Sequence, residues 1–129
     1  MTFIHDIFYD EKLNVDTILE IITNNSINIQ FEIFKILEKM YYRSKTTWVK
    51  EILYGMIVNT NLSSELRIQV ALLFENTLPN DVFLFVLSIL NTTDINIVLC
   101  YDCIKKFIPS YPSHSNSLIK IFTTLSCSL

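Results

Sequence analysis

The chain has 129 residues, of which half are hydrophobic and 18% are charged, and its formal net charge is −3 at pH 7. This length predicts one domain that folds without a metal or a disulfide. The acidic balance disfavours nucleic-acid binding, which depends on clustered Lys and Arg. A single glycine, Gly55, and three prolines disfavour a β-protein, because tight turns consume glycine. We therefore expect an all-α protein.

Targeting signals and membrane spans are not expected. The N-terminal stretch MTFIHDIFYDEK lacks the basic and apolar regions of a signal peptide. The most apolar run, VFLFVLSIL at 82–90, is about half the ~20 residues that a membrane span needs. Three cysteines, an odd number, favour reduced thiols. These features predict an intracellular protein, cytoplasmic or nuclear, with no membrane span.

The first predicted element is a short capping helix at about 2–10, with Phe3, Ile4, Ile7 and Phe8 on one face. Two short apolar motifs then alternate along the chain. The first series is ILEII (18–22), VKEIL (49–53), VLSIL (86–90) and LIKIF (118–122), and the second is INIQF (27–31), LRIQV (66–70) and INIVL (95–99). This alternation predicts helix pairs over about 16–108 and a closing helix at about 115–126.

The segment INIQFEIFKIL at 27–37 could be a strand or a helix. Its Ile and Phe content favours a strand. Its apolar residues instead recur at steps of four, three, three and four, as one helical stripe: Ile27, Phe31, Phe34, Leu37 and Tyr41. A strand would place the charged Glu32 on the same side as Phe34, so the helix is the better prediction.

Several residues are expected to mark helix boundaries. Thr17 to Glu20 has the pattern of a capping box. Ser63 or Ser64, and later Asp94, are expected N-caps before apolar runs, and Pro79 is expected to end a helix. The linkers are short and polar, which favours antiparallel packing of successive helices.

This alternation of antiparallel helices resembles the HEAT and armadillo repeat families over residue 16 to about 125. The intervals are shorter than the ~40–47 residues of those repeats, and the usual intra-repeat proline and Asp/Arg ladder are missing. The resemblance implies a short α-solenoid of about seven or eight helices in a single domain, 1–129, that binds other macromolecules. It carries over no functional residue.

The cysteines form the main candidate for chemistry. Cys100 and Cys103 make a C-x-x-C, and His114 and Cys127 downstream complete a weak candidate set for zinc. The pair lies in mid-helix, however, and the expected apolar stripe there is Ile95, Val98, Tyr101, Ile104 and Ile108. We therefore expect buried thiols that act as small apolar side chains. No metal or cofactor is predicted, and no catalytic motif indicates an enzyme.

Candidate partner-binding residues come from three patterns. The polar faces of the second helix series carry Glu32, Lys35, Lys39, Glu65, Gln69, Asp102 and Lys106. Tyr42 and Trp48 lie with Tyr41 near one helix–helix corner, where they are either interface anchors or buried helix ends. The helix at 82–90 is apolar on every side and needs cover, so Phe83 and Phe85 are further candidates.

The sequence thus predicts a non-enzymatic protein–protein interaction module, a small scaffold or adaptor subunit of a larger assembly, and an obligate protein partner is compatible with it. A homo-oligomer is compatible with it. The alternative is a compact bundle that resembles the viral relatives of the Bcl apoptosis regulators and binds an amphipathic helix in a groove. Its central helix would be the one at 82–90. A helical-repeat enzyme acting on nucleic acid is disfavoured by the acidic balance.

Overall fold

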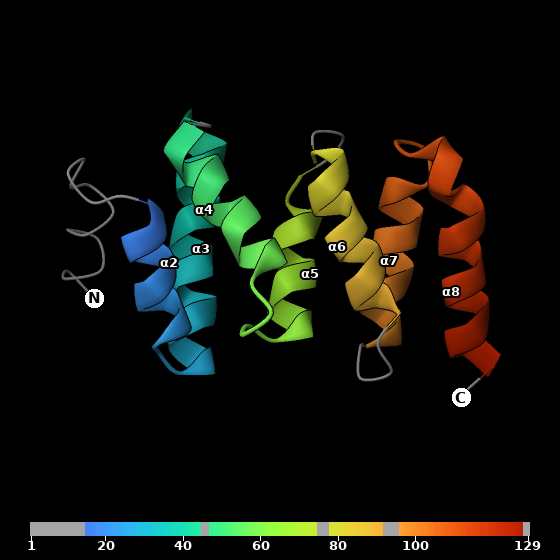
Figure 1. Cartoon of the computed structure of the whole chain (residues 1–129), viewed down its shortest axis with the longest axis horizontal. Helices are drawn as coiled ribbons and strands as arrows, with labels where there is room; N and C mark the ends of the chain where they lie inside the picture. Colours follow the sequence, from blue (N-terminus) through green and yellow to red (C-terminus); the bar gives the residue numbers. More distant parts are fainter. Residues whose placement is uncertain (1–14, 45–46, 75–77, 92–95, 128–129) are drawn as a thin grey trace. The chain divides into compact units, whose positions relative to one another are not determined.

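The structure is a computed structural model that describes residues 15–44, 47–74, 78–91 and 96–127, with side chains as far as residue 124. These residues form seven α-helices and one short 3-10 helix, with no strand among them (Figure 1). The helices are α2 (Val15–Thr23), α3 (Ile27–Ser44), α4 (Thr47–Val58), α5 (Ser64–Leu72), α6 (Asn80–Leu90), α7 (Ile97–Phe107), the 3-10 helix η1 (Pro112–His114) and α8 (Ser115–Cys127). The predicted all-α class is confirmed.

As far as their residues are described, the repeated motifs lie in helices or at the start of one. The first series lies in α2, α4, α6 and α8, and the second lies in α3 and α5 and at the start of α7. The segment 27–37 belongs to the 18-residue helix α3, which decides the question between strand and helix. The short helix expected at 2–10 lies outside the described residues.

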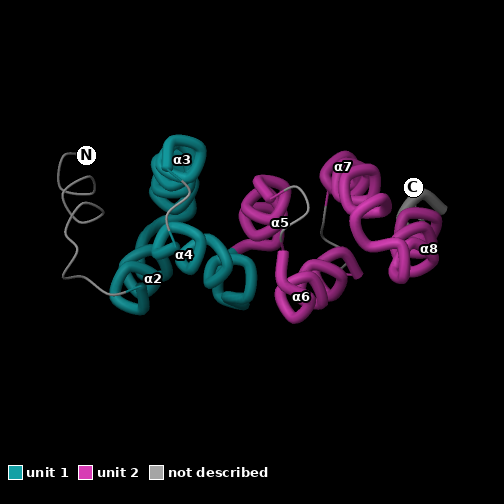
Figure 2. Tube along the Cα trace, turned by 90° about the horizontal axis from the view of Figure 1, so that it is seen from above, with its two compact units in different colours: residues 1–62 teal, residues 63–129 magenta. Residues whose placement is uncertain are grey.

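The chain divides into two compact units, residues 1–62 and 63–129 (Figure 2). The single domain and the solenoid stay predictions.

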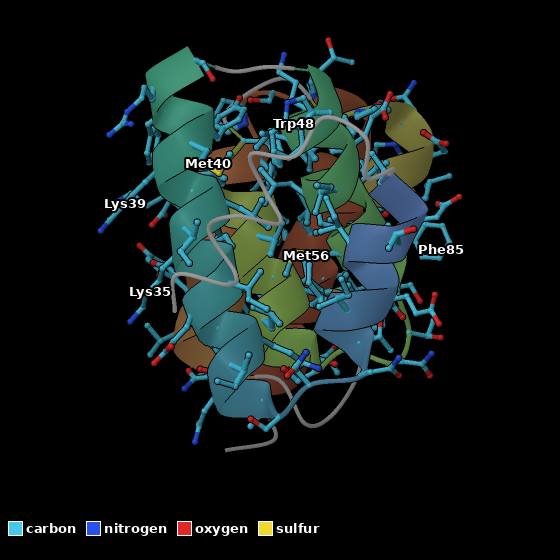
Figure 3. The ribbon with its side chains drawn as sticks, turned by 90° about the vertical axis from the view of Figure 1, so that its left-hand side faces the viewer. Lys35, Lys39, Met40, Trp48, Met56 and Phe85 are labelled. Carbon is cyan, nitrogen blue, oxygen red and sulfur yellow. The ribbon has the colours of Figure 1, made fainter. Side chains whose placement is uncertain are left out.

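In the first unit, α2 packs against α4, and α3 packs against both (Figure 2). The core side chains are Ile18 and Ile22 of α2, Ile33, Phe34, Leu37 and Tyr41 of α3, and Val49, Ile52, Leu53, Met56 and Ile57 of α4. Figure 3 shows Met56 pointing into this interior. Gly55 lets α2 come close to α4, because a Cβ at this position would lie 2.5 Å from Leu19 Cδ1.

Side-chain amides hold the helix ends of the first unit. Gln30 of α3 is buried, and its Nε2 donates to the carbonyls of Ile22 and Asn25, each at 3.1 Å. Asn59, which follows α4, donates from Nδ2 to Thr23 Oγ1 at 2.8 Å. These bonds tie α3 and the residue after α4 to the C-terminal end of α2 and to the turn that follows it.

In the second unit, α5 packs against α6 and α7, and α8 packs against α7 and η1. Phe83 of α6 is the centre of an aromatic cluster. Its ring stacks on Tyr111 at 3.9 Å between centroids and meets Phe107 edge-on at 5.6 Å. The Tyr111 hydroxyl donates to the carbonyl of Leu78 at 2.7 Å, so the ring also fixes the segment that leads into α6.

The boundaries agree with the predictions in part. Ser63 is the N-cap of α5, and its Oγ accepts from the Leu66 amide at 3.2 Å. The N-cap of α7 is Asn96 rather than Asp94, which lies outside the described residues. Pro79 stands at the N-cap of α6, so it begins a helix, where a missing N–H costs nothing. Thr17 lies inside α2 rather than at its N-cap.

Candidate interaction surfaces

The outer face of α3 carries a row of three cations, Lys35, Lys39 and Arg43, which we call the α3 cation row. All three are exposed. Their spacing of four residues places them on one side of the helix, successive side chains about 6 Å apart along its axis. Figure 3 shows Lys35 and Lys39 projecting away from α3 on the same side. Two of the three residues were predicted, and Arg43 was missed although its spacing from Lys39 signals it.

Two other predicted residues lie on the same face of α3. Tyr42 is 64% exposed, next to the end of the row, and Glu32 is exposed one turn before Lys35. Tyr41, by contrast, is buried, with its ring 6.0 Å from that of Tyr42. Trp48, in the first turn of α4, is half-buried. Of the three aromatic residues expected near one helix–helix corner, Tyr41, Tyr42 and Trp48, Tyr42 is the exposed one.

An apolar patch lies where α7 packs against α8. Val98 and Tyr101 of α7 are 63% and 50% exposed, and Ile119 of α8 is 51% exposed. Phe122 is half-buried, and its ring lies 5.6 Å from that of Tyr101. We call these four residues the α7–α8 apolar patch. Sequence reasoning missed it, since Val98 and Tyr101 were assigned to the buried stripe of their helix.

The buried face of α7 is formed by other residues, Cys100, Cys103, Ile104 and Phe107. Both thiols are fully buried and free. Burial raises the pKa of each thiol, and for Cys103 the neighbouring Cys100 and Asp102 raise the pKa further. Thiols that stay protonated are poor nucleophiles and poor metal ligands. This arrangement suits the predicted role of small apolar side chains.

Of the remaining members of the weak zinc set, His114 is the one whose side chain is described. The ring of His114 packs 5.4 Å from the ring of Phe83. The side chain of Cys127 lies outside the described part of the chain. Within that part, no three His, Cys, Asp or Glu side chains converge as a metal site would require.

Phe83 and Phe85 lie two positions apart in α6 and differ in burial. Phe83 is fully buried in the aromatic cluster, so its prediction as a partner contact is corrected: the ring is a core residue. Phe85 and Leu84 are 41% and 55% exposed, so α6 is not covered on every side as expected. A helix in which nearly every position is apolar gives no period from which to predict the buried side.

Lys106, another predicted partner contact, is half-buried. Its Nζ donates to the carbonyl of Leu72, at the C-terminal end of α5. A cation at this position satisfies a carbonyl without a helical partner and interacts favourably with the helix dipole. The other predicted residues of the second unit, Glu65 and Gln69 of α5 and Asp102 of α7, lie on exposed or partly exposed sides of their helices.

No helix among the described residues is long and apolar enough to cross a membrane. The chain matches no protein-family model, no curated protein and no solved structure.

Proposed function

We propose that the chain is a non-enzymatic protein-interaction module, a small intracellular scaffold or adaptor that presents helical surfaces to protein partners. The observation that carries this proposal is the α7–α8 apolar patch. Its two rings, Tyr101 of α7 and Phe122 of α8, lie 5.6 Å apart, and its other two side chains are at least half exposed. A full aromatic side chain has ~150–250 Å² of surface. Four large apolar side chains that are each about half exposed therefore offer about 300 Å² of apolar surface, a size at which exposed patches are often functional.

The packing inside each unit supports a repeat architecture for this module. In the first unit α2 contacts α4, and in the second α5 contacts α7, so helices of the same sequence series are neighbours. Stacked helix pairs predict these like-with-like contacts, and such stacks commonly serve as binding surfaces. The bundle alternative needs a central helix covered on every side, and the exposure of Leu84 and Phe85 in α6 does not favour it.

The test is a capture experiment with variants of the patch. The tagged chain and the double variant Tyr101→Ser, Ile119→Ser are used to recover partners from the source cells, with mass spectrometry and light scattering of the eluate. The matched control is Leu84→Ser, which removes an equally exposed apolar side chain from another helix of the same unit. Circular dichroism verifies that all three chains keep their helices.

We expect a stoichiometric protein partner with the wild type and the control, and its loss with the patch variant. A monomeric chain without a companion would contradict the proposal. If the patch variant retained the partner as well as the wild type does, the α7–α8 apolar patch would not be the binding surface.

A further inference from the structure

We propose that the outer face of α3 is a second docking surface, which binds an acidic segment of a protein through Lys35, Lys39 and Arg43. This inference concerns a different unit from the α7–α8 apolar patch and depends on different residues. It assigns a partner chemistry, a short stretch rich in Asp and Glu, to the α3 cation row.

The charges of the row are available to a partner. Lys35, Lys39 and Arg43 are exposed, and none of the three forms an ion pair with another residue in the described ranges. Glu32 stands on the same face before the row, and Glu38 lies half-buried at its side. With both Glu32 and Glu38 counted, the face still carries a net charge of +1 (three cations less two carboxylates). A carboxylate that docks there meets a positive surface.

Helix stabilisation does not account for the whole row. Cations near a C-terminus interact favourably with the helix dipole, but the effect fades within the last turn. Arg43 lies in that turn, whereas Lys35 lies nine residues before the helix end at Ser44. The row therefore extends more than a turn further toward the N-terminus than the dipole explains.

The spacing of the row fits carboxylates on a regular peptide. Successive cations lie about 6 Å apart along the axis. Acidic residues four apart on a helix have the same interval, and acidic residues two apart on an extended strand lie about 6.8 Å apart. Tyr42 adds an exposed ring beside Lys39 and Arg43, which suits a segment with an aromatic or aliphatic residue next to its acids.

A short acidic segment fits better than nucleic acid. Charges in ~0.15 M salt act over about 8 Å, so a short segment on the row responds to the local cations. A long polyanion would extend beyond the row onto a chain whose net charge is −3, and stable binding to a phosphate backbone draws on more cations than these three.

The test measures binding of a fluorescein-labelled peptide about 12 residues long, built from Asp and Glu with one Phe, to the full chain. Fluorescence anisotropy gives the dissociation constant at about 20 mM and about 150 mM NaCl. One triple variant, Lys35→Gln, Lys39→Gln, Arg43→Gln, removes the row. The control triple, Lys50→Gln, Lys105→Gln, Lys120→Gln, removes the same number of charges elsewhere, so both proteins have a net charge of −6 (−3 less three cations).

We expect the row variant to weaken binding about tenfold or more at the lower salt, and the control triple to weaken it less than about twofold. Tyr42→Ala should weaken binding several-fold without changing its salt dependence, because the ring carries no charge. The double variant of the α7–α8 apolar patch should bind the peptide as the wild type does, which separates this inference from the proposed function.

Three results would overturn the inference. The first is the absence of saturable peptide binding by the wild type. The second is an equal loss in both triple variants, which would mean that net charge alone attracts the peptide. The third is tighter binding to single-stranded DNA of equal charge, or to phosphatidylserine vesicles, than to the peptide, which would assign the row to phosphate groups.

Discussion

Replacing Phe83 by Ala should lower the free energy of unfolding much more than replacing Phe85 by Ala, two positions along α6. Phe83 is fully buried and stacks on Tyr111 at 3.9 Å, whereas Phe85 is 41% exposed. With ~200 Å² of aromatic surface at ~25 cal/mol per Å², full burial contributes up to about 5 kcal/mol and the partial burial of Phe85 up to about 3 kcal/mol.

Cavity formation widens this difference. Phe83→Ala leaves a void between Phe107 and Tyr111, so we expect the free energy of unfolding to fall by about 3–5 kcal/mol. Water fills the space left by Phe85→Ala, so the fall in its free energy of unfolding should stay below the ~3 kcal/mol that its partial burial contributes. Urea denaturation followed by circular dichroism measures both values. Equal losses in the two variants would refute the assignment of the buried face of α6.

Three further predictions concern other contacts. In a chain that already carries Leu19→Ala, Gly55→Ala should raise the free energy of unfolding by about 1 kcal/mol, because helix propensity improves. Beside the native Leu19 the gain should be clearly smaller, since Leu19 Cδ1 meets the new Cβ. Additive effects of the two substitutions in a double-mutant cycle would contradict the close approach. Lys106→Met should cost about 1–2 kcal/mol, since the Leu72 carbonyl loses its donor, and a cost no larger than for the exposed Lys105→Met would oppose this. Burial raises the pKa of the Cys103 thiol in the folded chain. Below the unfolded pKa of ~8.5 the thiol is protonated in both states, and its contribution to stability is complete. Above that pH the thiol ionises in the unfolded chain only, so the free energy of unfolding falls by ~1.4 kcal/mol per pH unit. Urea titrations at about pH 9 and about pH 10 should then show a steeper loss for the wild type than for Cys103→Ala, and parallel losses would refute the raised pKa.

Much of the secondary structure could be predicted from the sequence because its signals are local. The steps of three and four between apolar residues and the cap at Ser63 act over one or two helical turns, and the scarcity of glycine disfavours tight turns along the whole chain. The helix at 27–37 shows this well: its spacing outweighs a composition that favours a strand. The exposure of Lys35 and Lys39 on α3 follows from the same periodicity, whereas the sequence left Tyr42 open between an interface anchor and a buried helix end.

The buried sides of the apolar helices could not be predicted in the same way, because they depend on which neighbour covers them. In α6, Phe83 and Phe85 are alike in sequence, and only the packing of α6 beside Tyr111 and Phe107 selects the former for the core. In α7, contact with α5 and α8 leaves Val98 exposed and buries the thiols. The same long-range packing turns Lys106 into the partner of a carbonyl 34 residues away. Local spacing thus determines that these segments are helices, whereas burial is decided by contacts between segments far apart in the chain, to which local periodicity is blind.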